Sequence, residues 1–376
     1  MKTKILEILH VKGGESMKQF SCKTKLISGA GSITQLKTLN SHRLLLITDP
    51  YFAQNGVAQK VLSCSGAAQT RTFDRVQPDP TVELAAEATA VAKEFQPDTL
   101  VALGGGSAMD LTKAVSRFFG GTVQLVMIPT TSGSGSEVTD FAVLTHGNTK
   151  YPLVDGSLRP DMAILDSDLL TSLPKSLIAD AGFDVLGHAI EAFIATDATV
   201  FSDALAKEAF SVVFSRLPAS FAGDTEARLP IHQAATMAGL AFTHAGLGLC
   251  HALAHSLGAA YHIPHGRLIA MLLPAVMDCN AHVCGKKYAI LARAVGLPGS
   301  AESVAVRSLK TALVGLRRQL RMPQNLKEAG VDPYQVWQNA PDIVKTALAD
   351  PCCSTNPLPV ADFMVRRILE AVTGRG

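Results

Sequence analysis

The stretch His251-Ala-Leu-Ala-His255-Ser-Leu-Gly-Ala-Ala-Tyr-His-Ile-Pro-His265-Gly266 concentrates one residue type to an unusual degree. Five of the chain's 11 histidines fall between positions 244 and 265. Histidine is the usual residue for metal ligation and for proton transfer near neutral pH. His251 and His255 are four residues apart, so they share one face if the segment is helical. This density favours a common site over separate buried core histidines.

Gly258 and Pro264 are expected to break that helix before it reaches His265. An unbroken helix of 14 residues would carry His265 about 21 Å from His251, because each residue adds about 1.5 Å. A chain that turns after the first helix can bring His265 back to the same point. The sequence therefore predicts a helix, a turn and a third imidazole near the first.

A partner stretch lies upstream, between positions 180 and 193. Asp184 and His188 form another i, i+4 pair and are followed by a good helical sequence. Taken alone, Asp184 fits a helix start and His188 a buried polar group. Together with the downstream histidines they offer one carboxylate and two or three imidazoles. That set is plausible for a four-ligand metal site of nitrogen and oxygen donors.

Five separated motifs resemble, in the same order, those of the iron-dependent (group III) alcohol dehydrogenases. The resemblance runs from about Lys18 to the end of the chain. It is strongest to the short-chain alcohol dehydrogenases of ethanolamine- and propanediol-degrading bacterial microcompartments. The motifs are Gly104-Gly-Gly-Ser107-x-x-Asp110-x-x-Lys113, Pro129-Thr-Thr-x-Gly133-Ser-Gly135-Ser136-Glu137-Val138-Thr139, Gly182-Phe-Asp184-x-x-x-His188-Ala-Ile-Glu191, Ala245-Gly-Leu-Gly-Leu-Cys-His251-Ala-x-Ala-His255 and Pro264-His265-Gly266.

The resemblance implies an enzyme that interconverts short-chain alcohols and aldehydes with NAD and a metal ion. It makes Asp184, His188, His251 and His265 the metal ligands. His255 becomes the catalytic group that orients a ligand or relays a proton. The resemblance names Fe(II) as the metal, although Zn²⁺ would bind such a set at least as well by intrinsic affinity.

The order of strand and helix signals predicts two domains after an N-terminal extension. Residues 17–178 alternate buried strands with helices, which indicates an α/β NAD-binding domain with a mostly parallel sheet. Residues 179–376 lose the strand signals and are expected to form an all-helical metal-binding domain. The strands are expected at 43–48, 99–103 and 124–128, an early helix at 82–95, and later helices at 201–216, 230–242, 268–282 and 286–295.

A glycine run links the second of those strands to a helix. Glycines let a backbone approach a pyrophosphate, and a helix N-terminus supplies N–H groups. The spacing is not G-x-G-x-x-G, so local sequence alone leaves a plain glycine turn equally open. The resemblance favours phosphate binding, with further contacts from the next loop. The predicted cofactor residues of the two loops are Gly104, Gly105, Gly106, Ser107, Asp110, Thr130, Thr131 and Ser134.

Two more residues are expected near the cofactor riboses. Asp49 follows a strand, where a carboxylate suits a ribose hydroxyl and disfavours the 2′-phosphate of NADP. Its alternative role is a helix cap. Lys150 resembles the family lysine beside the nicotinamide ribose, with a solvated charge as its alternative.

Composition excludes several classes of partner. The formal charge is only +2, so nothing favours nucleic acid or a membrane surface. The longest apolar run, from Leu268 to Met277, is too short to span a bilayer. Seven cysteines without a CxxC pattern fit free thiols in a reducing cytosol. Residues 1–16 are either a peptide that docks to a microcompartment shell or the product of a misassigned start codon.

The substrate is the least determined feature. Ethanol and 1-propanol are expected, in a pathway that recycles NAD, with lactaldehyde, butanol-type and glycerol substrates as alternatives. Phe183, Gly187 and His244 depart from the usual family residues near the expected pocket, and Leu358 replaces a usual basic residue. A homodimer is expected, with a shell protein or an aldehyde dehydrogenase as further partner. Rivals are a lyase of the dehydroquinate synthase type, which needs clustered Lys and Arg, and a non-catalytic scaffold.

Overall fold

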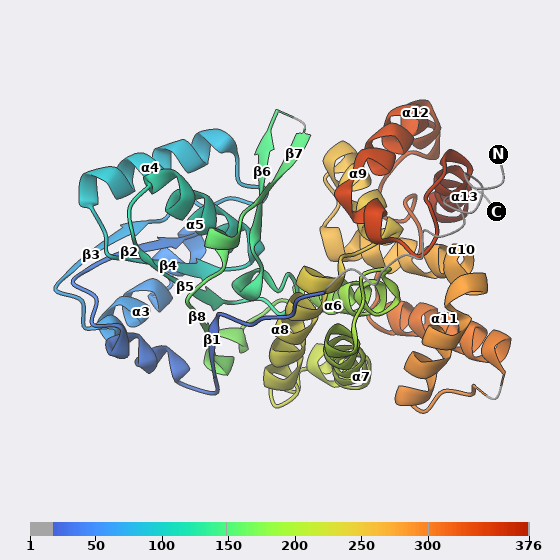
Figure 1. Cartoon of the computed structure of the whole chain (residues 1–376), viewed down its shortest axis with the longest axis horizontal. Helices are drawn as coiled ribbons and strands as arrows, with labels where there is room; N and C mark the ends of the chain where they lie inside the picture. The colour runs from blue at the N-terminus through green and yellow to red at the C-terminus, as the bar shows by residue number, and fades with distance from the viewer. Residues whose placement is uncertain (1–17, 148, 300, 375–376) are drawn as a thin grey trace, which may run out of the picture.

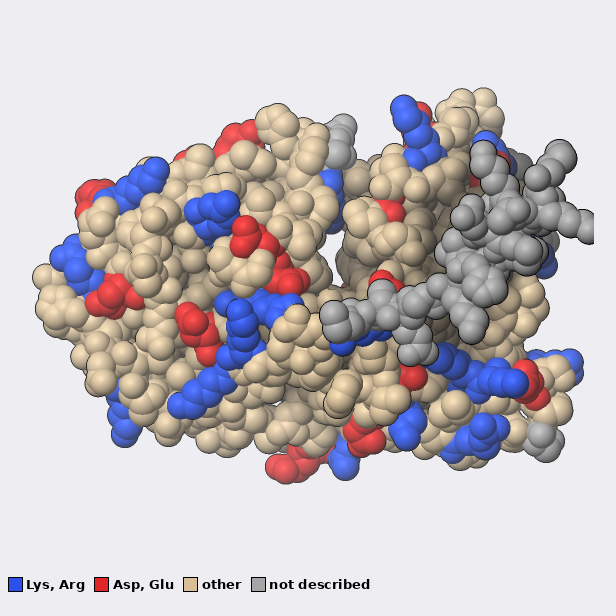
Figure 2. Space-filling model, in the orientation of Figure 1, with Lys and Arg blue, Asp and Glu red and all other residues tan. Residues whose placement is uncertain are grey.

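The computed structural model describes residues 18–147, 149–299 and 301–374, so the extension predicted over residues 1–16 lies outside it. Figure 1 shows two parts side by side, an α/β part built from the first half of the chain and a helical part from the second. Basic and acidic side chains are intermixed over the face shown in Figure 2, and an opening lies between the two parts in the upper half of that view. The predicted fold class is confirmed.

A six-stranded parallel sheet forms the centre of the first part, in the order β1-β8-β5-β4-β2-β3. Apart from the half-buried first residue of two of them, the central strands are buried, as expected where helices cover both faces. The predicted strand at 43–48 has its expected bounds, and the two at 99–103 and 124–128 are each one residue longer. The strands are β1 (Lys25–Ser28), β2 (Arg43–Thr48), β3 (Gln69–Phe73), β4 (Thr99–Gly104), β5 (Gln124–Pro129) and β8 (Met162–Leu165).

Helices α4 (Val82–Phe95) and α5 (Gly106–Phe119) pack on one face of this sheet. The other face is covered by the 3₁₀ segment η1 (Ser32–Leu39) and by α3 (Val57–Ser65). Short α2 (Pro50–Gln54) follows β2. An antiparallel hairpin of β6 (Phe141–His146) and β7 (Thr149–Val154) projects beside the helical part (Figure 1). The sheet thus holds the loops after β4 and β5 at one edge, facing the second part.

The second part contains long helices around one hydrophobic core. The strands end at Leu165, and the first long helix begins at Lys175. The predicted division at residue 178 stays a prediction. The helices are α6 (Lys175–Ile194), α7 (Val200–Ala222), α8 (Arg228–Ala245), α9 (Leu249–Tyr261), α10 (His265–Ala294), α11 (Glu302–Gln319), α12 (Pro333–Ala349) and α13 (Asp362–Thr373), with the 3₁₀ turn η5 (Pro351–Thr355) between the last two.

Two expectations about this part are wrong. Gly258 does not break α9, which continues to Tyr261. A helical glycine costs about 1 kcal/mol relative to alanine, which packing can offset. The turn comes instead at His262, which has a left-handed φ of 55°, and at Pro264, which precedes α10. The two helices expected at 268–282 and 286–295 are one continuous helix of 30 residues.

Among the described single helices, only α10 is long and apolar enough to cross a membrane. Its most apolar window is 61% buried against the rest of the protein. The consecutive helices α8 and α9 would pass the same test as a pair, but they are bent by 105°. Such burial is typical of a core helix, and α10 packs against α6, α9 and α11.

Candidate active site

Helix α6 positions the first two predicted ligands. Asp184 lies nine residues inside the helix, so it is not a helix-start residue. The one-turn spacing sets His188 Nε2 3.9 Å from Asp184 Oδ1. Both side chains are almost fully buried. The predicted shared helical face is therefore present, and it points into the protein interior.

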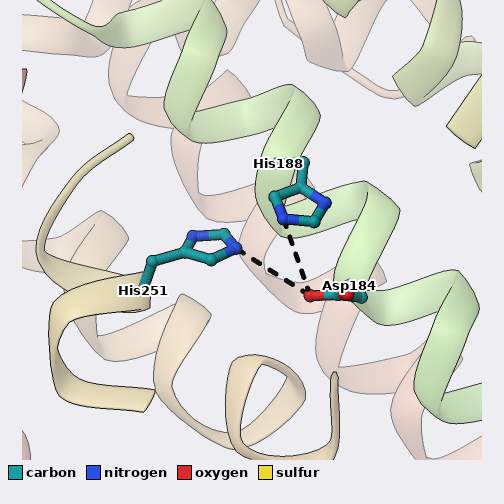
Figure 3. Close-up of side chains that lie close together, drawn as sticks. All are labelled: Asp184, His188 and His251. Carbon is teal, nitrogen blue, oxygen red and sulfur yellow. Dashed lines mark ion pairs between the residues drawn. The ribbon is translucent and has the colours of Figure 1, made fainter. Parts of the chain in front are cut away.

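Helices α9 and α10 bring two further imidazoles to the same carboxylate. His251 Nε2 lies 3.9 Å from Asp184 Oδ1, and His265 Nε2 lies 3.4 Å from it. Ligand atoms of Asp184, His188 and His251 all lie within 4.8 Å of one another (Figure 3). The turn at Pro264 makes His265 the first residue of α10 and returns it to the site. The structure thus gathers all four predicted ligands around one atom.

The arrangement fits a metal ion because buried polar atoms are left without partners. Asp184 Oδ1 and His251 Nε2 are buried and have no hydrogen-bond partner among the described residues. Burial, followed by the nearby Asp180, raises the pKa of Asp184 to about 7. Orphaned buried polar atoms are costly in a folded protein. A cation among these atoms would satisfy both and favour the ionised carboxylate.

The imidazoles are held in the neutral form that metal ligation requires. Burial, followed by the neighbouring His255, lowers the pKa of His251 to about 3. Burial also lowers the pKa values of His188 and His265 well below the usual range. The donor set is therefore one carboxylate and three neutral imidazoles, which suits Fe(II) or Zn²⁺.

Glu191 is a further candidate functional residue, to which the sequence motifs alone assign no role. Its carboxylate oxygen Oε2 lies 2.6 Å from His251 Nδ1, which leaves His251 Nε2 facing Asp184. The same carboxylate accepts the backbone N–H groups of Gly248, Cys250 and His251 at the start of α9. One buried side chain thus caps a helix and fixes the orientation of a ligand, as carboxylates behind metal-bound histidines do.

Replacing Glu191 by glutamine should weaken metal binding while leaving all four ligands in place. An amide offers one acceptor oxygen where the carboxylate offers two, and it lacks the charge that holds the His251 Nδ1 proton. Such partners typically contribute about 10–100-fold to metal affinity or activity. Competition with a graded chelator measures the change. Glu137→Gln removes another buried carboxylate, bonded to Thr236, and should leave metal affinity unaltered. Equal losses in both variants would contradict the orienting role.

His255 lies beside the cluster. Its ring centroid is 6.3 Å from that of His251 and 5.2 Å from that of His265. His255 Nδ1 is 2.8 Å from Asp350 Oδ2, and Asp350 also accepts the backbone N–H of Cys352. The sequence alone does not indicate a role for Asp350. The pair leaves Nε2 of His255 available for proton exchange, and about a third of the side chain is exposed.

The two predicted phosphate loops pack closely against each other. A Cβ added to Gly105 would lie 3.2 Å from Thr131 Oγ1, and one added to Gly106 would lie 3.2 Å from Ser134 Cβ. Gly104 has a φ of 153°, which disfavours other residues. The 14-residue helix α5 has no side-chain cap at its N-terminus. Its first N–H groups are therefore available to an anion.

A cleft of about 380 Å³ connects these loops to the metal ligands. Its walls include Gly106, Thr131 and Ser134 from the α/β part, and Asp184 and His265 from the helical part. An ion pair of Arg267 with Asp180 also lines it, at 2.9 Å. A ligand in this cleft would touch both predicted sites at once.

The remaining predicted cofactor residues have other partners in the structure. Asp49 caps α2 through the N–H of Phe52, and its Oδ2 would lie 3.8 Å from a Cβ at Gly104. Lys150 forms an ion pair with Asp79 at 2.7 Å. Asp110 accepts hydrogen bonds from the Ser136 hydroxyl and the Val143 N–H. Thr130 is buried, and Ser107 lies in the first turn of α5. Their contacts with a cofactor stay predictions.

The unusual residues near the expected pocket have structural roles. Phe183 is buried in the helical core. A side chain at Gly187 would clash with Ile269, so this glycine allows α6 and α10 to approach. His244 accepts the backbone N–H of Ser21 at 3.1 Å and packs against Phe20. It therefore anchors the N-terminal segment to the helical part.

Comparisons with known proteins agree with this geometry. The family model of iron-containing alcohol dehydrogenases matches residues 23–167 of this chain. The family model of the C-terminal part of Fe-containing alcohol dehydrogenases matches residues 178–373. The chain is 40% identical to the 1-propanol dehydrogenase PduQ of Citrobacter freundii, over 94% of this chain and 99% of that protein. It is 34% identical to an NADPH-dependent butanol dehydrogenase of Clostridium saccharobutylicum, over 95% and 98% of the two chains.

Among solved structures, an iron-containing alcohol dehydrogenase from Thermococcus thioreducens superimposes with a TM-score of 0.88 at 32% identity, covering 95% of this chain and all of that one. The match therefore includes both parts of the fold. All four predicted metal ligands lie inside the region matched by the C-terminal family model. The chain belongs to the iron-containing alcohol dehydrogenase family of oxidoreductases.

Proposed function

We propose that this protein reversibly interconverts short-chain primary alcohols and their aldehydes with NAD(H) and a bound metal ion. The observation that carries the proposal is the shared cleft, whose walls join the glycine-rich loops to Asp184 and His265. A hydride donor held by the loops would then face the carbonyl carbon of a substrate whose oxygen lies near the metal ligands. Ethanol and 1-propanol are the proposed alcohols.

Asp184, His188, His251 and His265 would hold the metal, with Fe(II) as the proposed ion. When bound, the metal supplies a Lewis acid for the substrate oxygen and the nicotinamide supplies or accepts the hydride. Glu191 fixes the orientation of His251. His255 exchanges the proton of the alcohol through Nε2, while Asp350 holds its Nδ1. The α5 N-terminus and the loop around Ser134 bind the cofactor diphosphate.

The rival lyase reading is disfavoured by the charges of the cleft. A phosphate- and carboxylate-bearing substrate of that class needs several cations. The described residues that line the cleft include one Lys or Arg side chain, Arg267, and it is already paired with Asp180. A small uncharged alcohol or aldehyde needs no such cluster.

The substrate range is tested by a panel of C2 to C4 aldehydes, with lactaldehyde and dihydroxyacetone as alternatives. Iron-loaded protein is assayed anaerobically for NADH oxidation with each. Acetaldehyde and propanal should give the highest kcat/KM. The butanol dehydrogenase relative makes butanal the informative competitor. A preference for dihydroxyacetone would indicate a glycerol dehydrogenase. If no carbonyl compound supported NADH oxidation, the protein would be better explained as a non-catalytic scaffold.

Asp49 makes NADH the proposed cofactor over NADPH, because its carboxylate would repel a 2′-phosphate. Asp49→Asn keeps the cap of α2 and removes the charge, whereas Asp49→Gly removes both at a cap cost of only a few tenths of a kcal/mol. Both variants should increase the NADPH/NADH ratio of kcat/KM by about tenfold, which corresponds to about 1.4 kcal/mol of lost repulsion. If the wild type used NADH and NADPH equally, Asp49 would act only as the cap of α2.

The cellular setting is proposed from the resemblance to dehydrogenases of bacterial microcompartments. We propose a cytoplasmic homodimer that recycles NAD, within or beside such a compartment, with a shell protein or an aldehyde dehydrogenase as partner. The seven described cysteines are all free thiols, which agrees with a reducing environment. The mass of the protein in its native host tests whether residues 1–16 are present as a docking segment.

A further inference from the structure

A second group of metal-ligand atoms lies next to the first. His255, Asp350 and Cys352 each offer one donor atom, and these three atoms lie within 4.8 Å of one another. None of the three belongs to the first group. We propose that this second ligand group binds a thiophilic divalent ion such as Zn²⁺, and that the bound ion inhibits the enzyme without displacing the metal of the first site.

The chain holds the second ligand group in a fixed arrangement. Asp350 ends α12 and caps η5, where its Oδ1 accepts the Cys352 N–H at 2.8 Å. Its other oxygen, Oδ2, lies 2.8 Å from His255 Nδ1 on α9. Two donors therefore come from one tight turn and the third from a packed helix. An ion would replace the hydrogen bond between Asp350 and His255, and the two atoms would move apart by about half an ångström to reach tetrahedral ligand distances.

The donor chemistry separates the two sites. The first group consists of a carboxylate and three imidazoles, whereas the second combines nitrogen, oxygen and sulfur. Thiolate ligands select Zn²⁺ and similar soft ions. Three protein ligands with one open position is also a common zinc arrangement. Fe(II) should accordingly prefer the first site, and Zn²⁺ in excess should reach the second.

Access also differs between the groups. Asp184, His188 and His251 are buried, whereas all three members of the second group are partly exposed. An ion from solution can therefore reach the second group directly. No described Lys or Arg forms an ion pair with Asp350 in the structure, so its carboxylate is not already neutralised by a fixed cation.

Ion binding changes the protons of the second group in a defined way. Cys352 loses its thiol proton to solvent as the metal–sulfur bond forms. His255 binds the ion through Nδ1, so its single proton moves to Nε2. A protonated Nε2 cannot accept a proton from an alcohol. This inhibitory consequence rests on the proposed role of His255, whereas binding itself does not.

The test titrates metal-free wild-type protein with Co²⁺, which reports its ligands by colour. Wild type should bind two ions per chain, and the second should produce a near-ultraviolet thiolate-to-cobalt absorption band. Cys352→Ser and Cys352→Ala should each bind one ion without the band. Cys353→Ser is the matched control, because the Cys353 thiol instead donates to the Ala347 carbonyl at 3.1 Å. It should still bind two ions with the band.

Binding of one ion by the wild type, or a band that persists in both Cys352 variants, would overturn the proposed site. These readouts need neither substrate nor NADH, so they stand apart from the proposed function. In iron-loaded wild type, excess Zn²⁺ should lower the rate of alcohol oxidation by at least tenfold while iron content stays constant. Loss of iron in step with activity would overturn the inhibitory role, since zinc would then be acting at the first site.

Discussion

Alanine in place of Asp184, His188, His251 or His265 should leave the purified protein with little bound metal. Each replacement removes one of four donors from a site whose remaining atoms are largely buried. Asp184→Ala should have the largest effect, because its Oδ1 is the atom that all three imidazoles approach at 3.4–3.9 Å. Loss of a partner behind a ligand already costs about 10–100-fold, so loss of a ligand should exceed that.

Metal per chain is measured by mass spectrometry after anaerobic loading with Fe(II) and desalting. His232→Gln is the control, since His232 is another buried histidine of the helical part that bonds to Ser132 rather than to Asp184. It should retain a full complement of metal. If a variant kept its full metal content, the residue replaced in it would not be a metal ligand.

His255→Ala should keep metal and NADH binding but slow turnover by about 10²–10⁴-fold, the usual contribution of a positioned acid–base group. His255 shares a helical face with His251, yet its Nδ1 is engaged by Asp350 and not by Asp184. The change should appear in kcat, with the Kd for NADH from fluorescence unchanged.

Asp350→Asn separates positioning from proton exchange. The amide can still bond to His255 but lacks the charge, so kcat should fall less than in His255→Ala and metal content should stay constant. The assignment would be reversed if the His255 variant were metal-free while the His251 variant stayed loaded.

Much of the metal site follows from spacing within single helices. Asp184 and His188 are four residues apart, and so are His251 and His255, and helical geometry alone puts each pair on one face. Spacing does not say which member of a pair binds an ion. In the structure, His251 Nε2 lies 3.9 Å from Asp184 Oδ1, and the distant carboxylates Glu191 and Asp350 engage Nδ1 of His251 and Nδ1 of His255, respectively.

Those carboxylates show where local sequence is insufficient. Glu191 and His251 are separated by 60 residues, and Asp350 and His255 by 95, so only the packing of helices brings them together. The end of α9 was misplaced for a related reason. Gly258 is compatible with a helix that packs against α10 and α12, whereas Pro264 and the left-handed His262 enforce the turn.

The cofactor loops were predicted as segments, but their mutual packing was not. A glycine run after a strand is compatible with a plain turn. The narrow space at Gly105 and Gly106 depends on Thr131 and Ser134, which belong to the next loop. For Asp49 and Lys150, the local sequence is compatible both with a cofactor contact and with the contacts observed, which are capping of α2 and pairing with Asp79.

The most direct measurement is NADH oxidation by propanal with metal-free protein, before and after addition of one equivalent of Fe(II) under anaerobic conditions. The four-ligand site predicts no activity before addition and recovery afterwards, with Zn²⁺ restoring less even if it binds as tightly. Exposure to air should then inactivate the iron-loaded protein. Full activity in protein shown by mass spectrometry to be metal-free would contradict the account.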